Sequence, residues 1–382
     1  VYLGIKPYAP KTDSPWPHRY GESRDYQRYT HVPSLAEQKR REWDHDEHIQ
    51  RLADAAAGKK PHEKALGVDQ TPAPPGTVLL PELPPTLREA RSRLVIGSAA
   101  SWSTEFEQDG RSWLLGADLM FFPKDRVAPY KPVSFHGVHF DESIKLPIAF
   151  FKKKARPKYA IDGEGKMVAN GQQWERLDWV QLTGKSHTYE GANYLETVEP
   201  GIFTAASDAT VPNPQDHTPW GAPIHQPDTT GRAPKGRGTW LEVSITGGWM
   251  VAFEGTTAVF ATLISPGRGG PPARGIDPLK TASTPTGQWP VTGKFSTAMM
   301  VAPEDLIHSD VPWAQNFHGP HALHGAYWHD QWGEWKSAGC VNLAPIDGRW
   351  LFHWTEPPIP EGWHGIRWDD KLGPATWLIV HD

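Results

Sequence analysis

Apolar and polar residues alternate along Trp240–Thr246, which is the pattern of a β-strand. Gly247 and Gly248 follow and supply a turn, and a second apolar run returns from Trp249 to Phe253. Val259–Ser265 has the composition of a further strand. These runs predict a hairpin and a third strand at the start of a β-rich domain, which we place at residues 238–382.

Short apolar runs separated by turn residues also occupy the middle of the chain. One group comprises Gly110–Asp118, Phe121–Pro123 and Val127–Pro129, and Trp174–Leu182 has the pattern of a later strand pair. Such spacing predicts small β modules, which we place at residues 90–160 and 161–237. The second ends in a linker, residues 212–238, that is rich in Pro, Gly, Asp and Thr.

A charged helix is expected near Ser34–Ala57, since Ser34 and Glu37 have the spacing of a capping box. Prolines crowd the segments Thr71–Gly76 and Leu83–Pro85, which are too stiff for a helix. Residues 1–89 are therefore predicted to form an irregular and helical N-terminal region that ends in a proline-rich linker.

A second helix is expected near the other end of the chain. Ile346, Trp350 and Trp354 recur every fourth residue, as on the apolar face of a short amphipathic helix.

Composition agrees with a mainly β protein of many turns. The 382 residues include 38 prolines, 36 glycines and 19 tryptophans, whose aromatic side chains supply much of the area to be buried. The net charge of −5 offers no basic surface for nucleic acid, and no apolar run is long enough to span a membrane.

The single cysteine, Cys340, stands in the most informative segment. A lone thiol can form neither an internal disulfide nor a cysteine-rich metal site, so it is either a small buried apolar residue or a nucleophile. A nearby imidazole could accept the thiol proton, and His324 precedes Cys340 by 16 residues. The small residues Ser337–Gly339 could aim backbone N–H groups at a developing oxyanion.

These residues resemble the signature of the YkuD-type L,D-transpeptidases, which is His-Gly followed by Ser/Thr-His-Gly-Cys, an apolar residue and Asn or Arg. His324-Gly325 and Ser337–Asn342 match it at every position but one, since Ala338 stands where most members have histidine. Thr284–Gly287 is similar to the Thr-Pro-x-Gly element that precedes the active site in that family. Gly110–Pro129 resembles bacterial SH3-like modules.

The resemblance implies a role for each matching residue. Cys340 would be the nucleophile and His324 the general base, with the carbonyl of Gly325 orienting the imidazole and the N–H groups of Gly339 and Cys340 forming the oxyanion hole. Asn342 would brace the loop. Expected substrate-binding residues are Tyr327, Trp328, His329, Ser337 and Asn342.

Four nearby histidines allow an alternative, a metal site. His318, His321, His324 and His329 have spacings of three, three and five residues, but the helical His-Glu-x-x-His pattern is absent and glycine and proline interrupt the segment. We therefore predict no metal ligands, and the resemblance implies no cofactor.

The implied architecture is a C-terminal L,D-transpeptidase domain preceded by one or two SH3-like barrels. The implied activity is removal of the terminal D-Ala from a peptidoglycan tetrapeptide stem through a Cys340 thioester, with transfer to an amine of a second stem or of an outer-membrane or wall protein. Water as acceptor would give a carboxypeptidase, and loss of turnover would leave a wall-binding protein. We expect an extracytoplasmic location, with a signal or lipid anchor removed ahead of Val1.

Overall fold

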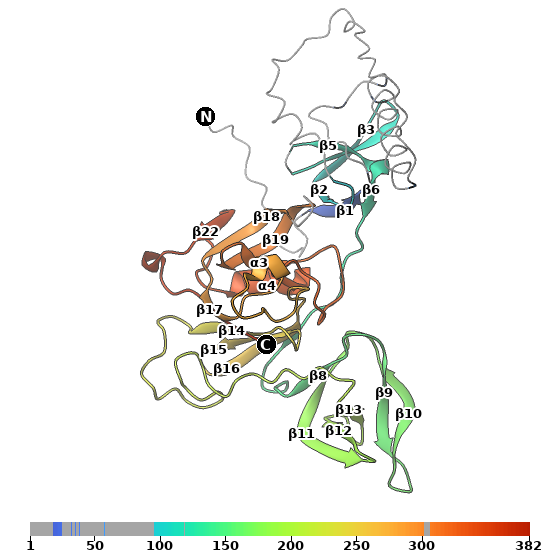
Figure 1. Cartoon of the computed structure of the whole chain (residues 1–382), viewed down its shortest axis with the longest axis vertical. Helices are drawn as coiled ribbons and strands as arrows, with labels where there is room; N and C mark the ends of the chain where they lie inside the picture. Colours follow the sequence, from blue (N-terminus) through green and yellow to red (C-terminus); the bar gives the residue numbers. More distant parts are fainter. Residues whose placement is uncertain are drawn as a thin grey trace, which may run out of the picture. The chain divides into compact units, whose positions relative to one another are not determined.

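The computed structural model in Figure 1 describes residues 18–24 and 95–382, except 118 and 302–305, together with the single positions 32, 35, 38 and 57. Apart from three of these single positions, the helix expected over residues 34–57 lies outside the described residues, as does the proline-rich linker. The chain divides into two compact units, Gly21–Pro129 and a larger one made of Val1–Tyr20 and Tyr130–Asp382. The domain boundaries given above remain predictions.

The smaller unit is built from short strands, as expected. β3 (Thr104–Gln108), β4 (Arg111–Leu115) and β5 (Phe121–Pro123) form a three-stranded antiparallel sheet. The 3-10 helix η1 (Lys124–Arg126) leads to β6 (Val127–Pro129), which pairs with β1 (Arg19–Ser23), and β2 is Ala99–Trp102. Trp113, Leu114 and Phe122 are buried and form the apolar interior of this unit.

The larger unit begins with a module that we call the middle module. Its sheet has the order β10-β9-β13-β12-β11-β8 and is antiparallel throughout. The strands are β8 (Ile148–Phe150), β9 (Arg156–Ile161), β10 (Met167–Trp174), β11 (Trp179–Tyr189), β12 (Ala192–Thr197) and β13 (Phe203–Ala205). Its end strands β10 and β8 do not pair, so the described residues show no closed barrel, and the SH3-like form expected upstream is not confirmed.

The C-terminal part of the larger unit contains the predicted hairpin. β14 (Thr239–Ser244) and β15 (Trp249–Glu254) pair with Ser244 opposite Trp249, and β16 (Thr257–Leu263) follows, which confirms these three strands. They belong to a six-stranded sheet of order β17-β23-β14-β15-β16-β7. Its other strands are β7 (Val138–His139), β17 (Gly287–Pro290) and β23 (Trp377–His381).

A second layer holds the segment around Cys340. β18 (Gly293–Val301), β19 (Ile307–His318) and β20 (His321–Gly325) are antiparallel neighbours, with β21 (Val341–Leu343) parallel to β20 and β22 (Gly365–Arg367) beside β18. Among the residues that the structure describes, the other helices are α3 (Pro278–Thr281), α4 (Pro345–Trp354) and η3 (Asp370–Leu372). α4 confirms the helix predicted from the four-residue spacing.

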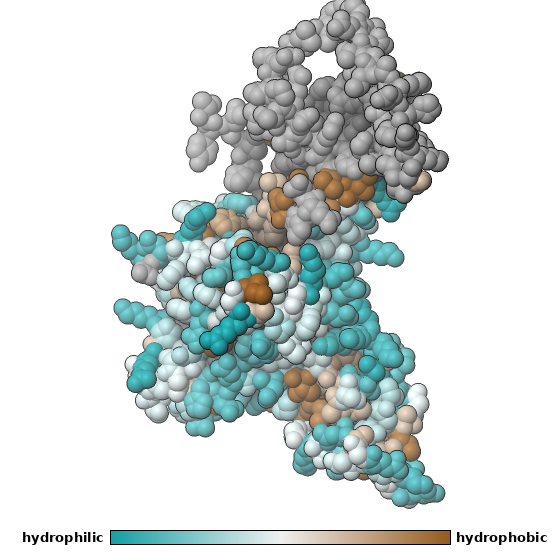
Figure 2. Space-filling view, viewed as in Figure 1, coloured by the Kyte–Doolittle hydropathy of each residue, from teal (hydrophilic) through white to brown (hydrophobic). Residues whose placement is uncertain are grey.

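The hairpin strands are buried on both faces because apolar cores lie on either side of their sheet. Trp240, Val251 and Phe253 belong to one core, whereas Leu241, Val243 and Met250 belong to the other, together with Leu323 of β20, Val341 of β21 and Leu351 of α4. This alternation follows from the two-residue period of a strand. On the face of the molecule shown in Figure 2, the coloured surface residues are mainly hydrophilic.

Candidate active site

The pairing of β20 with β21 brings the two halves of the cysteine-histidine motif together. Leu323 lies opposite Val341 and His324 opposite Asn342 in a parallel register, so Cys340, immediately before β21, comes beside Ala322. Side chains opposite each other in a sheet share a face, and alternate residues share it too. Cys340, Asn342 and His324 therefore lie on one face, and Leu323 and Val341 pack into the core on the other.

His324 is buried and fixed by its neighbour. Its Nδ1 lies 3.2 Å from the carbonyl oxygen of Gly325, so Nδ1 carries the hydrogen and donates it, which leaves the Nε2 lone pair free. The pKa of His324 is lowered to about 4, chiefly by burial; the Gly325 carbonyl opposes this shift, and nearby His308 adds to it. The imidazole is thus neutral near pH 7 and available as a base.

Cys340 is half-buried, and its burial raises the pKa of the thiol. The backbone N–H of Ala322 acts in the opposite direction because it can donate to a thiolate. The resting pair is therefore thiol and neutral imidazole, and the thiol must lose its proton as it attacks.

The turn Ser337–Cys340, which we call the Cys340 turn, is held from within by Ser337. The buried hydroxyl of Ser337 donates to the carbonyl oxygen of Cys340 at 2.5 Å and accepts the N–H of Gly339 at 3.0 Å. The Gly339 N–H, which was expected to belong to the oxyanion hole, is hydrogen-bonded to Ser337 in this structure. Ser337, which was expected to bind substrate, instead shapes the turn that presents Cys340.

A second segment supports the same turn from outside. Gly267 pairs with Ser337, and the N–H of Arg268 donates to the Ser337 carbonyl at 2.8 Å. The N–H of Gly267 in turn donates to the buried hydroxyl of Thr284 at 2.9 Å. Thr284, the first residue of the Thr-Pro-Thr-Gly element, therefore reaches the Cys340 turn through Gly267.

The side chains of His329 and Asn342 lie in contact. The His329 Nε2 lies 3.0 Å from the side-chain amide nitrogen of Asn342, and the N–H of Gln331 donates to His329 Nδ1 at 3.2 Å. Burial, followed by the charge of Lys336, lowers the pKa of His329 to about 3. His329 is thus a neutral neighbour of Asn342.

Trp328 and Tyr327 differ in how far a substrate can reach them. The Trp328 ring is half-buried and lies 5.7 Å from the ring of His324 and 4.2 Å from that of His308. Tyr327 is buried, with its hydroxyl donating to the carbonyl of Ser309 and its ring stacked at 3.7 Å on Tyr20. His308, which no local motif indicated, is half-buried, and its partial burial lowers its pKa to about 4.

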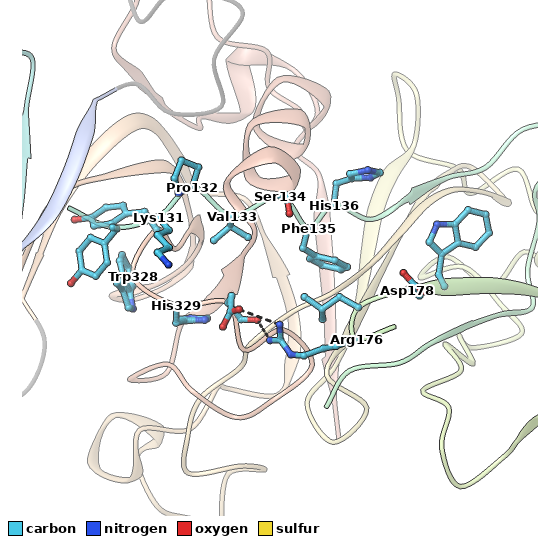
Figure 3. Close-up of a pocket in the computed structure, with 15 residues that line it drawn as sticks. Lys131, Pro132, Val133, Ser134, Phe135, His136, Arg176, Asp178, Trp328 and His329 are labelled. Carbon is cyan, nitrogen blue, oxygen red and sulfur yellow. Dashed lines mark hydrogen bonds and ion pairs between the residues drawn. The ribbon is translucent and has the colours of Figure 1, made fainter. Parts of the chain in front are cut away.

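A pocket of about 760 Å³ lies beside these residues (Figure 3). Trp328, His329 and Asp330 form one side, Tyr130–His136 a second, and Arg176–Trp179 of the middle module a third. Sequence reasoning missed the last two sides, because they lie far from the motif along the chain.

The histidines considered as metal ligands do not gather. His318 packs on Trp289 with ring centroids 4.0 Å apart, and its carbonyl oxygen lies 3.1 Å from His321 Nδ1. Within the described part of the chain no group of three or more His, Cys, Asp or Glu residues could hold a metal ion. Nor does that part contain a helix long and apolar enough to cross a membrane.

Comparison with known proteins gives one family match, and no curated protein matches the chain. Residues 238–364 match the family described as the YkuD L,D-transpeptidase catalytic domain.

Solved structures of L,D-transpeptidases are also similar. That of residues 123–326 of the Xylanimonas cellulosilytica protein is 22% identical over 39% of this chain and 63% of its own, with a TM-score of 0.27. A mutant of the Enterococcus faecium enzyme is 20% identical over 37% of this chain and 49% of its own, with a TM-score of 0.28. The Mycobacterium smegmatis structure is 14% identical over 67% of this chain and 89% of its own, with a TM-score of 0.27.

The chain thus spans less than two thirds of the first two structures, and the family match rests on its C-terminal part. Residues 238–364 form an L,D-transpeptidase catalytic domain of the YkuD family.

Proposed function

We propose that this protein is a cysteine-dependent L,D-transpeptidase that acts on peptidoglycan stem peptides. One observation carries the proposal: Cys340 and His324 lie on the same face of adjacent parallel strands, and the Gly325 carbonyl fixes the imidazole so that its free Nε2 is basic. This is the arrangement that a thiol nucleophile and its base require.

In the first half-reaction the Cys340 sulfur attacks the carbonyl carbon of the bond that links the L-centre of the stem diamino acid to D-Ala. His324 Nε2 takes the thiol proton as the carbon–sulfur bond forms. The N–H of Cys340 is the donor proposed for the resulting oxyanion, because the Gly339 N–H is bound to Ser337. The carbon–nitrogen bond then breaks, and D-Ala leaves with the proton from His324.

In the second half-reaction an amine attacks the thioester. The amine passes a proton to His324, the new amide forms, and the released Cys340 sulfur recovers that proton, so the enzyme returns to its starting state. The Ala322 N–H stabilises the sulfur while it carries negative charge. No metal or organic cofactor takes part in this sequence.

The acceptor and the place of action belong to the same proposal. The amine would come from a second stem, which crosslinks the wall, or from an outer-membrane or wall protein, and the reaction would take place in the periplasm or cell envelope. The upstream modules, whether SH3-like or not, would then bind the wall or a partner.

The test is incubation with purified muropeptides and mass spectrometry of the products, with the Cys340→Ala protein as control. We expect loss of D-Ala together with a crosslinked dimer, both absent from the control. Loss of D-Ala alone would indicate a carboxypeptidase, and no product in the parent would favour a wall-binding protein that has lost turnover.

A further inference from the structure

The pocket beside Trp328 is completed by a segment outside the residues that match the family. This segment, Tyr130–Phe140, which we call the strap, leads into β7, where Val138 lies opposite Ala261 and His139 opposite Phe260 of β16. The strap thus contains β7, the edge strand of the six-stranded sheet of the C-terminal part.

A buried carboxylate fixes the strap at Gly137. Both side-chain oxygens of Asp347, in α4, accept the N–H of Gly137, at 2.9 and 3.1 Å, and Thr262 donates its hydroxyl to one of them at 2.5 Å. Only glycine fits at residue 137, because a Cβ there would lie 2.4 Å from the carbonyl oxygen of Ala261. The strap residues before Gly137 therefore have a defined place at the pocket.

An ion pair fixes the opposite wall. Arg176 of the middle module donates to the Asp330 carboxylate at 3.1 Å and to the Asp330 carbonyl oxygen at 2.5 Å (Figure 3). This pair cancels the two charges against each other. Within the described residues no ion pair engages the exposed Lys131, and the other carboxylate of the lining, Asp178, accepts the N–H of Glu175.

Much of the remaining lining is apolar or aromatic, beside the polar side chains of Ser134, His136 and Asp178, and its apolar part continues to the proposed base. Val133, Phe135 and Trp179 line the pocket together with Trp328, which lies 5.7 Å from the ring of His324. His329, on the same side, contacts Asn342, two residues after Cys340. The pocket volume of about 760 Å³ falls in the range of about 300 to 1,000 Å³ found for ligand sites.

We propose that this pocket binds the stem peptide, with a free carboxylate of the peptide on Lys131 and its backbone and methyl groups against Val133 and Trp328. The inference rests on the proposed function and gives the strap and the middle module a part in substrate selection.

The test measures binding without turnover, in the Cys340→Ala background. A tetrapeptide stem and the same peptide with its terminal carboxylate amidated are titrated into the protein by calorimetry. Lys131→Gln should weaken binding of the free acid about fivefold, the scale of an exposed ion pair. Amidation should cause a similar loss in the parent and none in Lys131→Gln.

Two further variants keep the result specific. Ser134→Trp places a bulky ring in the pocket from an exposed strap residue and should remove measurable binding, whereas Lys154→Gln, at an exposed lysine outside the pocket, should leave the affinity unchanged. An affinity for the free acid that neither Lys131→Gln nor Ser134→Trp alters would overturn the inference, as would equal losses on amidation with and without Lys131.

Failure of the proposed function gives a different result. In that case the protein with Cys340 intact forms no product from muropeptides, whatever the affinities of the Lys131 and Ser134 variants. Normal turnover combined with binding that is insensitive to both residues would instead reject the pocket alone.

Discussion

The Nε2 atom of His321 lies against Gly339, so close that a Cβ on this glycine would be 3.0 Å from it. The imidazole is buried, held through Nδ1 by the carbonyl of His318, and located on the opposite face of β20 from His324. It therefore packs beneath the Cys340 turn, whose own residue 338 is an alanine.

This contact predicts that His321 positions the nucleophile. His321→Ala should leave a cavity under the turn and slow acylation of Cys340 about tenfold, since small displacements of a reacting group are costly. His321→Gln, which can keep a hydrogen bond to the His318 carbonyl, should recover part of the rate. The measurement is the rate of carbapenem acylation, with melting temperatures recorded alongside.

His318→Ala is the matched control, because it keeps the carbonyl that His321 contacts, and it should have a smaller effect. Ala338→His in the His321→Ala background should restore some of the rate if an imidazole beside the turn is what matters. A His321→Ala protein that is stably folded and acylated at the parental rate would rule out this role.

Cys340 is predicted to be the sole site of acylation. Carbapenem-type β-lactams, which mimic the scissile amide, should add one covalent mass to the parent protein and none to Cys340→Ala. Intact-protein mass spectrometry gives the answer, and an adduct on the alanine variant would contradict the assignment.

His324→Ala is predicted to lower the acylation rate roughly a hundredfold or more, the usual contribution of a positioned general base. His308→Ala removes a ring near Trp328 but no proposed proton acceptor, so it should lower the acylation rate much less. Equal losses in the two variants would show that packing around Trp328, rather than proton transfer, sets the rate.

The pH dependence of acylation follows from the pKa of His324. Because burial lowers this pKa to about 4, the imidazole loses its activity as a base only as the pH falls through about 4. The rate should therefore be nearly constant from about pH 5 to 8, and rise at higher pH as the thiol, whose pKa is raised, begins to ionise. A pH–rate profile with an inflection near 6.5 would show that His324 is not the titrating base.

Asp347 is predicted to make stability depend on pH. Burial raises the pKa of this carboxyl from 3.8 to about 6, so the folded state holds the proton more tightly than the unfolded state. The resulting stabilisation is fully present below about pH 4 and is lost as the pH rises through about 6. Asp347→Asn, whose amide can still bond Gly137 and Thr262, should remove this dependence.

Chemical denaturation of the parent and Asp347→Asn proteins between pH 4 and 8 provides the measurement. The difference between their unfolding free energies should change by about 3 kcal/mol at most over this range, from the size of the pKa shift. Parallel pH profiles would mean that Asp347 does not titrate in this range.

Much of the candidate site could be proposed from the sequence because its residues lie close together along the chain. His324, Gly325, Cys340 and Asn342 belong to two adjacent strands, and a local motif suffices to find them. The hairpin of β14 and β15 and the helix α4 were likewise visible in local periodicity.

The rest depends on contacts that local pattern does not encode. Tyr327, expected to bind substrate, is stacked on Tyr20, 307 residues earlier in the chain. Ser337 has a hydroxyl that could contact a substrate, yet this hydroxyl forms hydrogen bonds within the Cys340 turn. The sequence does contain one indication of such a contact. Asp347 lies in the helix that was predicted from its apolar face, and a carboxylate buried there needs a hydrogen-bond donor.

The hydrogen bond between Asp347 and Gly137 also bears on where this protein can be truncated. A polypeptide that begins at residue 238 retains the carboxylate of Asp347 but lacks Gly137, and it leaves the edge of β16 open where β7 lay. A buried charge without its donor and an unprotected strand edge favour misfolding and self-association. We therefore expect the shortest soluble catalytic fragment to start before the strap, about a hundred residues ahead of the family boundary.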